Sequence, residues 1–304
     1  MPRYNLQIKV GTYTGNGVDN TSITGVGFRP QLVITKGGAN IACFRTRHMS
    51  ADSCAYFAGN TANFAGGIKG ILDDGFQVGT DAKANANGTV YYYIAIRGTD
   101  AQQYFRTVVY KGNGSDSRQL TAAGVFFQPN IFWTKGDTAQ NPSVRTEAVV
   151  GDDSWHFSGT VNGSNEIQNF VASGVELGTS ARVNSSAVDY FATALRHFSG
   201  YITSGTYVGN GTSLSVTGLG FQPDFVIVKD GATTSNAVFK TSEMSGLDSA
   251  PTGSSTLTTT AITAFGADGF SLGNSVFANA SGDTFYYFAF KAGNFNVPIA
   301  RTAV

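Results

Sequence analysis

Residues able to do acid–base or metal chemistry are few in this sequence. Its three histidines are His48, His156 and His197, and no HxH, HExxH or CxxC motif occurs. A metal or acid–base site needs several ligands at matched spacing. We therefore expect surface or half-buried histidines, no bound metal and no cofactor.

The acidic residues also give no catalytic pattern. Carboxylate pairs occur at Asp73-Asp74 and Asp152-Asp153, in stretches typical of solvated loops. A glycosidase needs two carboxylates about 5 to 10 Å apart in a cleft, and sequence alone does not place these pairs so. No Gly-x-Ser-x-Gly motif is present, and no glycine-rich loop precedes a helical pattern. We expect no enzymatic activity, with a polysaccharide-cleaving enzyme as the catalytic alternative.

Aromatic residues provide the candidate binding site. β-Sandwich proteins often bind sugars through an exposed aromatic side chain beside polar loop residues. Trp155 lies beside His156 in a predicted loop, so this pair is our candidate ligand-binding site, with a host-surface glycan as the ligand. Trp133 lies within an apolar run and is expected in the core.

Composition excludes several classes of partner. Twenty basic and 20 acidic residues balance to a formal net charge of zero. A nucleic-acid binder needs a basic stripe and a membrane-surface binder a polybasic segment, so we expect neither nucleic-acid binding nor membrane insertion. Cys43 and Cys54 are too few for a disulfide scaffold and are expected to be buried thiols.

The chain carries the same seven motifs three times in the same order. A Gly-Asn-Gly triplet, recurring at steps of 97 residues, is followed by a Phe-x-Pro motif and an apolar run ending in lysine. A basic residue before threonine, an Asp-Ser pair, a glycine-containing turn and a closing aromatic run come next. The repeated turn residues are Asn16, Asn113 and Asn210, with Pro30, Pro129 and Pro223. This order indicates a triplicated domain, at residues 1–103, 104–200 and 201–304.

Each repeat is predicted to be a β-sandwich. Short runs rich in Val, Ile, Thr, Phe and Tyr alternate with clusters of Gly, Asn, Ser and Asp, a pattern typical of all-β folds. No sustained helical period is present, and residues 51–58, the best helix candidate, are not assigned as helix. We predict an all-β protein of three tandem, jelly-roll-like sandwiches of about 97 residues each.

The motifs have structural interpretations. Gly-Asn-Gly predicts a tight hairpin turn, because both residue types tolerate positive φ. Phe-x-Pro predicts a buried phenylalanine and a proline that ends one strand and starts the next. Asp74-Gly75-Phe76 predicts another hairpin, and the Asp-Ser pairs predict turns. The closing aromatic run is expected to be a central strand covered on both faces.

The end of the sequence resembles the start of a further copy. Residues 300–304 are similar to residues 105–109, which open the second repeat. We predict a C-terminal extra strand that pairs with an edge strand of this chain or of a neighbour. The joins at residues 98–100 and 199–201 are short, so we expect the three sandwiches to pack in a fixed arrangement.

The repeated pattern YxGNG…GFxP…K…DGFxLG…YYxAxK resembles a repeat family of tailed-bacteriophage structural proteins. It is fullest in the third repeat, at Tyr207–Gly211, Asp268–Gly273 and Tyr286–Lys291, and covers essentially the whole chain. The second repeat departs most, with Lys111 before its triplet and Val175 in place of phenylalanine. The resemblance implies tail-fibre-like β-sandwiches on a virion, assembled in the host bacterial cytoplasm, with a structural or adhesive role and no catalytic residues.

Two functions follow as hypotheses. The first is a virion-surface structural protein, decorating the capsid or otherwise bound to the particle, with other virion proteins or further copies of itself as partners. The alternative is a receptor-binding tail fibre or adhesin that recognises a host-surface glycan or protein. A cellular adhesion or matrix protein is a further alternative.

Overall fold

β-Strands form almost all of the regular structure in the computed structural model, which describes residues 5–98, 104–121 and 124–296. The all-β fold expected from the short β-branched and aromatic runs is confirmed. Residues 51–58 are not helical, and the two helices among the described residues are single turns, α1 (Ala82–Asn85) and α2 (Val276–Asn279).

The first unit, β1 to β8, folds into two antiparallel sheets. Its larger sheet, here called the inner sheet because it faces the other units, has the order β1 (Asn5–Thr14), β8 (Val90–Arg97), β3 (Leu32–Gly37), β4 (Cys43–Thr46) and β5 (Ala55–Tyr56). Its outer sheet has the order β2 (Thr21–Thr24), β7 (Gly75–Val78) and β6 (Ile68–Leu72).

The second unit, β9 to β17, repeats this arrangement. Its inner sheet has the order β9 (Phe105–Lys111), β17 (Asp189–Leu195), β11 (Ile131–Gly136) and β12 (Ser143–Thr146). Its outer sheet has the order β10 (Arg118–Leu120), β16 (Gly174–Leu177) and β15 (Ile167–Val171). A small hairpin of β13 (Asp153–Ser154) and β14 (Gly163–Ser164) continues the inner sheet through a bridge between Val144 and Trp155.

The third unit, β18 to β25, has the same strand order again. Its inner sheet has the order β18 (Ile202–Val208), β25 (Thr284–Phe290), β20 (Phe225–Asp230), β21 (Val238–Thr241) and β22 (Ala250–Pro251). Its outer sheet has the order β19 (Leu214–Thr217), β24 (Gly269–Leu272) and β23 (Ile262–Gly266). A last strand, β26 (Gly293–Asn296), leaves this unit and pairs with β1, whereas residues 300–304, for which an extra strand is predicted, lie outside the described residues.

Within a unit, the strands nearest the two ends of the chain segment pair as they do in a jelly roll. The first and last strands pair in the inner sheet, and the second and second-last strands pair in the outer sheet. The remaining strands pair as sequential hairpins, such as β3 with β4 and β6 with β7. The closing aromatic strands β8, β17 and β25 have a strand on each side in their sheets, as expected.

Of the two predicted hairpins, one is confirmed and the other is wrong. Asp74-Gly75-Phe76 forms a hairpin between β6 and β7, with Phe76 fully buried, as predicted. The Gly-Asn-Gly prediction of a hairpin is wrong, because β1 and β2 lie in different sheets and the triplet crosses between them. Only the second glycine of each triplet has positive φ, 69° at Gly17, 73° at Gly114 and 72° at Gly211.

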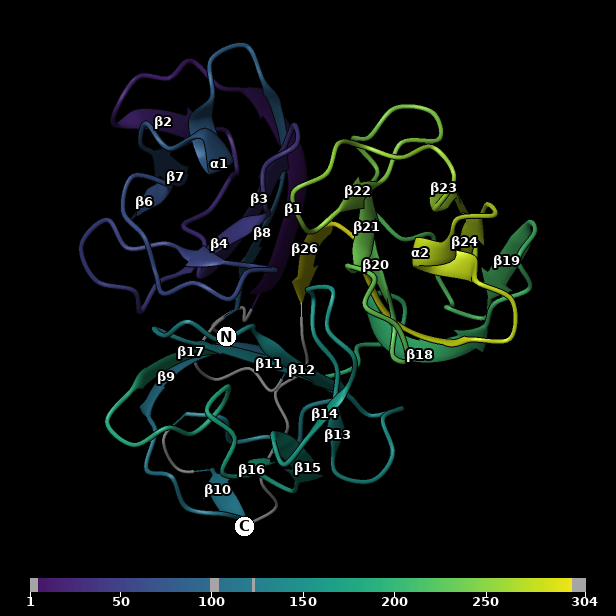
Figure 1. The fold of residues 1–304 in the computed structure, drawn as a ribbon. Helices are drawn as coiled ribbons and strands as arrows, with labels where there is room; N and C mark the ends of the chain where they lie inside the picture. Colours follow the sequence, from purple (N-terminus) through teal and green to yellow (C-terminus); the bar gives the residue numbers. More distant parts are fainter. Residues whose placement is uncertain (1–4, 99–103, 122–123, 297–304) are drawn as a thin grey trace.

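Each inner sheet is buried on both faces. One face packs on the unit's own outer sheet, in three separate cores. The other face packs into a single cluster with residues from all three units, here called the central core. Figure 1 shows the arrangement: three lobes surround a common centre, with the outer sheets at the periphery. All residues of β3, β11 and β20 are buried as a result.

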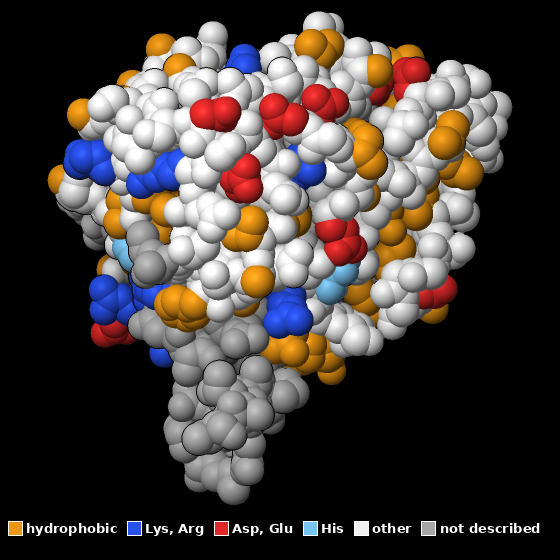
Figure 2. All heavy atoms as spheres, turned by 90° about the horizontal axis from the view of Figure 1, so that it is seen from below, with side chains coloured by type: hydrophobic (Ala, Val, Ile, Leu, Met, Phe, Trp, Pro, Cys, Tyr) orange, Lys and Arg blue, Asp and Glu red, His pale blue; other side chains and the backbone are white. Residues whose placement is uncertain are grey.

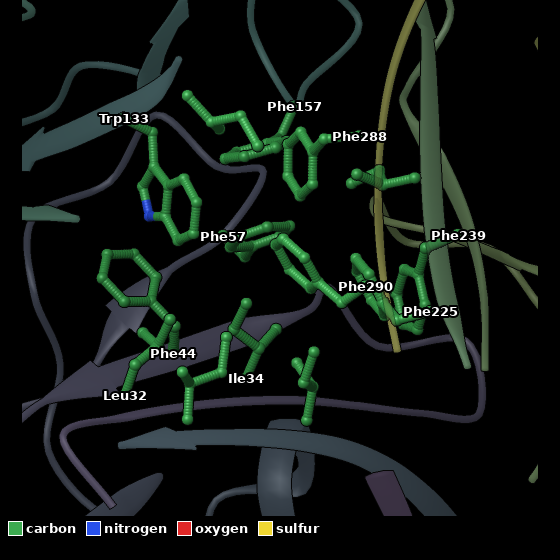
Figure 3. Close-up of a cluster of buried hydrophobic side chains, with 14 of the residues drawn as sticks. Leu32, Ile34, Phe44, Phe57, Trp133, Phe157, Phe225, Phe239, Phe288 and Phe290 are labelled. Atoms are coloured by element: carbon green, nitrogen blue, oxygen red, sulfur yellow. The ribbon is translucent and has the colours of Figure 1, made fainter. Parts of the chain in front are cut away.

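Aromatic rings dominate the central core (Figure 3). Phe57 of the first unit stacks on Phe157 of the second, with ring centroids 3.9 Å apart. Trp133 of the second unit stacks on Phe288 of the third at 5.8 Å, with an interplanar angle of 5°. Stacked aromatic pairs contribute about 0.5–1.5 kcal/mol beyond their buried area. The expected fixed packing of the three units therefore has a physical basis in this shared core.

Candidate functional site

The predicted ligand-binding pair, Trp155 and His156, lies inside the protein. Both side chains have 0% exposure, so the prediction of an exposed Trp155 is wrong. Trp155 pairs with Val144 of the inner sheet and its ring lies 5.4 Å from Phe157 in the central core. The predicted loop is in fact the edge strand of an inner sheet, whose inward face is covered by the third unit. Trp133 is also fully buried, as expected.

His156 and Glu166 are buried and form an ionic cluster with the half-buried Arg182. Its Nε2 lies 3.0 Å from Glu166 Oε2, and Arg182 donates to Glu166 Oε1 at 2.8 Å. Its Nδ1 lies 3.0 Å from the carbonyl of Val161, which can accept only, so Nδ1 carries a proton. Burial raises the pKa of Glu166, but the hydrogen bond and charge of His156, with Arg182, outweigh it and hold this pKa below its usual value.

The hydrogen bonds of this cluster hold a loop in place. Both ring nitrogens of His156 are engaged, and the hydrogen bonds hold the loop of residues 157–163 against the outer sheet. At the equivalent positions the first unit has Tyr56 and Lys83, and the third unit has Pro251 and Phe277. Since a partner-less buried charge costs several kcal/mol, the three ionic residues form one structural unit. The sequence signal that could reveal it is that histidine, glutamate and arginine occur together at these positions only in the second repeat.

The other two histidines lie where one unit meets the next. His48 of the first unit donates from Nε2 to the carbonyl of Thr107 on β9, 2.9 Å away. His197 accepts at Nε2 a hydrogen bond of 3.0 Å from the backbone N–H of Ser204 on β18. Burial lowers the pKa of His197, against the opposing effect of Glu147. Both histidines are half-buried, as predicted. Each is hydrogen-bonded to the first strand of the following unit.

The lysines that end the apolar runs are buried and donate to loop carbonyls, and Lys36 also bonds the carbonyl of Ser255 in the third unit, at 2.9 Å. Lys36, Lys135 and Lys229 have 0% exposure. Each donates to backbone carbonyls of the loop that follows its strand; Lys36, for example, bonds the carbonyls of Gly38 and Asn40. Burial lowers the pKa of all three lysines from 10.5 to about 8. These repeated cations are hydrogen-bonded to backbone carbonyls.

The basic residues before threonine have the same kind of role. Arg45 donates to the carbonyls of Met49 and Ala51, and Arg145 donates to those of Val149 and Gly151. Lys240 does the same with the carbonyl of Gly246 at 3.0 Å. Each cation fixes the loop between the fourth and fifth strands of its unit.

The repeated asparagines pair with partners that sequence reasoning missed. The backbone N–H groups of Asn16, Asn113 and Asn210 donate at 2.8–3.0 Å to the side chains of Asn85, Asn184 and Asn279. These three partners are fully buried, whereas the triplet asparagines are exposed. Their recurrence 69, 71 and 69 residues after the triplet was the available signal. Pro30, Pro129 and Pro223 are buried just before β3, β11 and β20 and do not follow a strand directly.

The Asp-Ser pair of the first unit lies one residue earlier than the Asp-Ser pairs of the other two units. Ala55, Trp155 and Ala250 occupy equivalent positions, opposite Phe44, Val144 and Phe239. The residue before each is therefore Cys54, Ser154 or Ser249, so Asp52-Ser53 is not equivalent to Asp153-Ser154. The predicted thiols are confirmed as buried, and both cysteines are free.

Phe126 is the exposed aromatic residue of the second unit. Its side chain is 43% exposed, and the guanidinium of Arg106 lies 3.8 Å from its ring centroid. The equivalent residues are Gly27 and Gly220, with φ of 88° and 78°, whose loops are held by Asp74 and Asp268. Ser173 replaces that aspartate in the second unit. Among the described phenylalanines and tryptophans, Phe126 alone is largely exposed.

Two surface hollows recur at equivalent places. One, of about 450 Å³, lies between β1, the loop at Val26–Phe28 and the segment Ala292–Asn294. The other, of about 430 Å³, lies between Tyr201, the loop at Gly220–Gln222 and Lys291. On the face in Figure 2, most of the surface is uncharged, with acidic and basic side chains scattered over it.

Equivalent backbone hydrogen bonds join units in a cyclic order: the first unit to the third, and the third to the second. Ala42 of the first unit donates its backbone N–H to the carbonyl of Thr252 in the third, at 2.9 Å. Ala237 of the third donates in the same way to Phe157 of the second, at 3.0 Å. The equivalent residue of the second unit is Pro142, which has no N–H to donate to Phe57 of the first. The three units therefore surround an approximate threefold axis.

Comparison with known proteins gives one family match. A family model described as a domain of unknown function (DUF7483) matches residues 197–302, the segment of the third unit. No curated protein and no solved structure matches the sequence. Within the described residues, no helix is long and apolar enough to cross a membrane.

Proposed function

We propose that this protein is a non-enzymatic structural protein of the bacteriophage virion surface, decorating the capsid or otherwise bound to the particle. The observation that carries the proposal is the single central core, to which all three units contribute. This core makes the chain one body with approximate threefold symmetry. Such a body suits a site of local threefold symmetry on a particle built from many copies of one protein.

The repeated sequence pattern supports the same proposal. It resembles repeats of tailed-bacteriophage structural proteins, and its motif residues hold loops and turns within each unit. The proposed partners are other virion proteins, and the proposed location is the virion, after assembly in the host bacterial cytoplasm.

The solution mass of the purified protein is the first test. Light scattering should give a mass near 31.9 kDa, because the three units of one chain already complete the threefold arrangement. A mass three times larger would instead favour a trimeric fibre. Quantitative mass spectrometry of purified virions should then give a copy number comparable to that of the capsid protein. A copy number of a few per particle would contradict decoration.

The alternative function is a tail adhesin for a host-surface glycan, and Phe126 is the observation that favours it. Its exposed ring is a flat apolar surface on which the C–H face of a sugar can stack, and the guanidinium of Arg106 lies over one ring face. Phe126→Gly, which copies the residue of the other two units, should abolish cell binding without changing the fold if this alternative holds. Unchanged binding would remove it.

A further inference from the structure

The strand β26 lies in a sheet of a different unit from the one it follows. It leaves the third unit after β25 and pairs antiparallel with β1 of the first unit. The register joins Asn5 to Asn296, Leu6 to Phe295, Gln7 to Asn294 and Ile8 to Gly293. Among the described residues, this is the only β-ladder that connects two units.

The junction with this ladder differs from the other two junctions in having no peptide linker. The first and second units are joined by the chain between β8 and β9, and the second and third by the chain between β17 and β18. The first and third units are not consecutive, so no peptide segment joins them directly. At this junction β26 supplies a backbone ladder, in addition to the backbone bond from Ala42 to Thr252.

Phe295 fixes β26 at the place where the linkers between units pass. Its ring centroid lies 4.0 Å from that of Tyr201 and 6.5 Å from that of Phe198. Phe198 in turn lies 4.7 Å from Tyr104, at the start of the second unit. Leu6, opposite Phe295, is fully buried in the central core. The strand is therefore tied to the first unit by backbone pairing and to the other two by ring contacts.

We propose that β26 is a closing strap, which holds the first and third units together as the covalent linkers hold the other neighbours. When β26 detaches, the junction between these two units opens and water reaches the central core. Detachment leaves the three outer-sheet cores intact, because each lies within one unit.

The two tryptophans of the chain report this opening directly. Trp133 and Trp155 both lie in the central core with 0% exposure. The strap is broken by Gly293→Pro with Phe295→Ala, which removes the backbone donor of the pair with Ile8 and the ring contact. We expect a red-shifted tryptophan emission, stronger acrylamide quenching and proteolysis faster by about tenfold or more. Far-UV circular dichroism should remain that of the parent protein.

A matched control has the same two changes on another edge strand. Ala264→Pro with Phe265→Ala alters β23, at the edge of the third unit's outer sheet and outside the central core. This variant should keep the parent's tryptophan emission and quenching. Equal quenching in the strap variant and the control would overturn the proposal.

A cross-linked variant tests the strap in a protein whose sequence is otherwise intact. Gln7→Cys with Asn294→Cys places two thiols directly opposite each other across the ladder. The oxidised form should show weaker tryptophan quenching and slower proteolysis than the same protein after reduction. Identical behaviour of the two forms would overturn the proposal even if the strap-broken variant failed to fold.

Discussion

The second and third units fill the same place in the central core with opposite choices of residue. In the second unit Trp133 pairs across strands with Thr193, and in the third Ile227 pairs with Phe288. Each pair combines a larger and a smaller side chain. The larger one is on the third strand of the second unit but on the closing strand of the third unit. The large rings, Trp133 and Phe288, then stack on each other across the junction. Divergence between the two copies is thus complementary.

The first unit completes this fit with intermediate side chains. Its equivalent pair is Ile34 with Ile94, and its Phe57 stacks on Phe157, where the third unit has Thr252. Protein interiors are close-packed, so residues of these sizes fit in one arrangement only. Three copies of the second unit would bring three Trp133 side chains to the axis. The fused chain can therefore use a packing that no symmetric trimer of one unit could adopt.

Removing the large ring of the second unit should have the largest effect. Trp133→Ala is expected to lower the free energy of unfolding by about 3–5 kcal/mol, because it removes buried surface and leaves a cavity. Urea denaturation followed by circular dichroism measures this change. The test of complementarity is a double-mutant cycle with Phe288→Ala, for which we expect a coupling of about 0.5–1.5 kcal/mol.

The cycle has a matched control within the same core. Phe239 also lies in the central core, on β21 of the third unit, and stacks on Phe225 at 5.6 Å within its own unit. A cycle of Trp133→Ala with Phe239→Ala should give a coupling near zero. Equal couplings in the two cycles would show that the stacked pair has no special role in the fit between units.

The backbone bonds between units offer a second way to test the comparison. Ala42→Pro removes the N–H that bonds Thr252, and leaving this buried carbonyl unpaired should cost about 1–3 kcal/mol. Pro142 shows that the backbone accepts proline at the equivalent position. Pro142→Ala should be nearly neutral, because a new bond of about 0.5–1.5 kcal/mol offsets the lost restriction of the unfolded chain. Equal stability of Ala42→Pro and the parent protein would contradict this account.

Features within a unit could be predicted from the sequence better than features between units. The hairpin at Gly75, the central closing strands and the buried Phe28, Phe127 and Phe221 follow from local patterns and are confirmed. These patterns depend on residues close in sequence or in one sheet. Repetition also allowed Trp133 to be placed in the core, by its alignment with Ile34 and Ile227.

The candidate site was mispredicted because its environment comes from another unit. Trp155 follows a polar loop and aligns with alanine, so nothing nearby in sequence indicates that its ring packs beside Phe288 of the third unit. The Gly-Asn-Gly triplet was taken for a hairpin for a similar reason. Turn chemistry gives the local φ, but not whether the next strand stays in the same sheet.

The central core differs between the units, but a buried lysine is present at the same position in all three. The folded protein holds their pKa near 8, whereas the ordinary value is 10.5. Below pH 8 both folded and unfolded chains bind these protons, and the cost of burying the charges is complete. Between pH 8 and 10 the folded chain releases protons that the unfolded chain keeps. The free energy of unfolding should therefore rise with pH in this window, by at most about 1.4 kcal/mol per pH unit for each lysine.

Urea denaturation at pH 7.5 and 9.5 measures this slope. The upper limit of the window is set by buried tyrosines such as Tyr190, whose pKa is raised by burial and whose titration has the opposite sign. Lys36→Met, Lys135→Met and Lys229→Met should each reduce the slope by a similar amount, because each removes one cation whose pKa is lowered to about 8 by burial. A flat profile would contradict the burial of charged lysine. Unequal reductions would show that the units differ inside their loops as well as at the axis, and that the division between shared interior and divergent junction is incomplete.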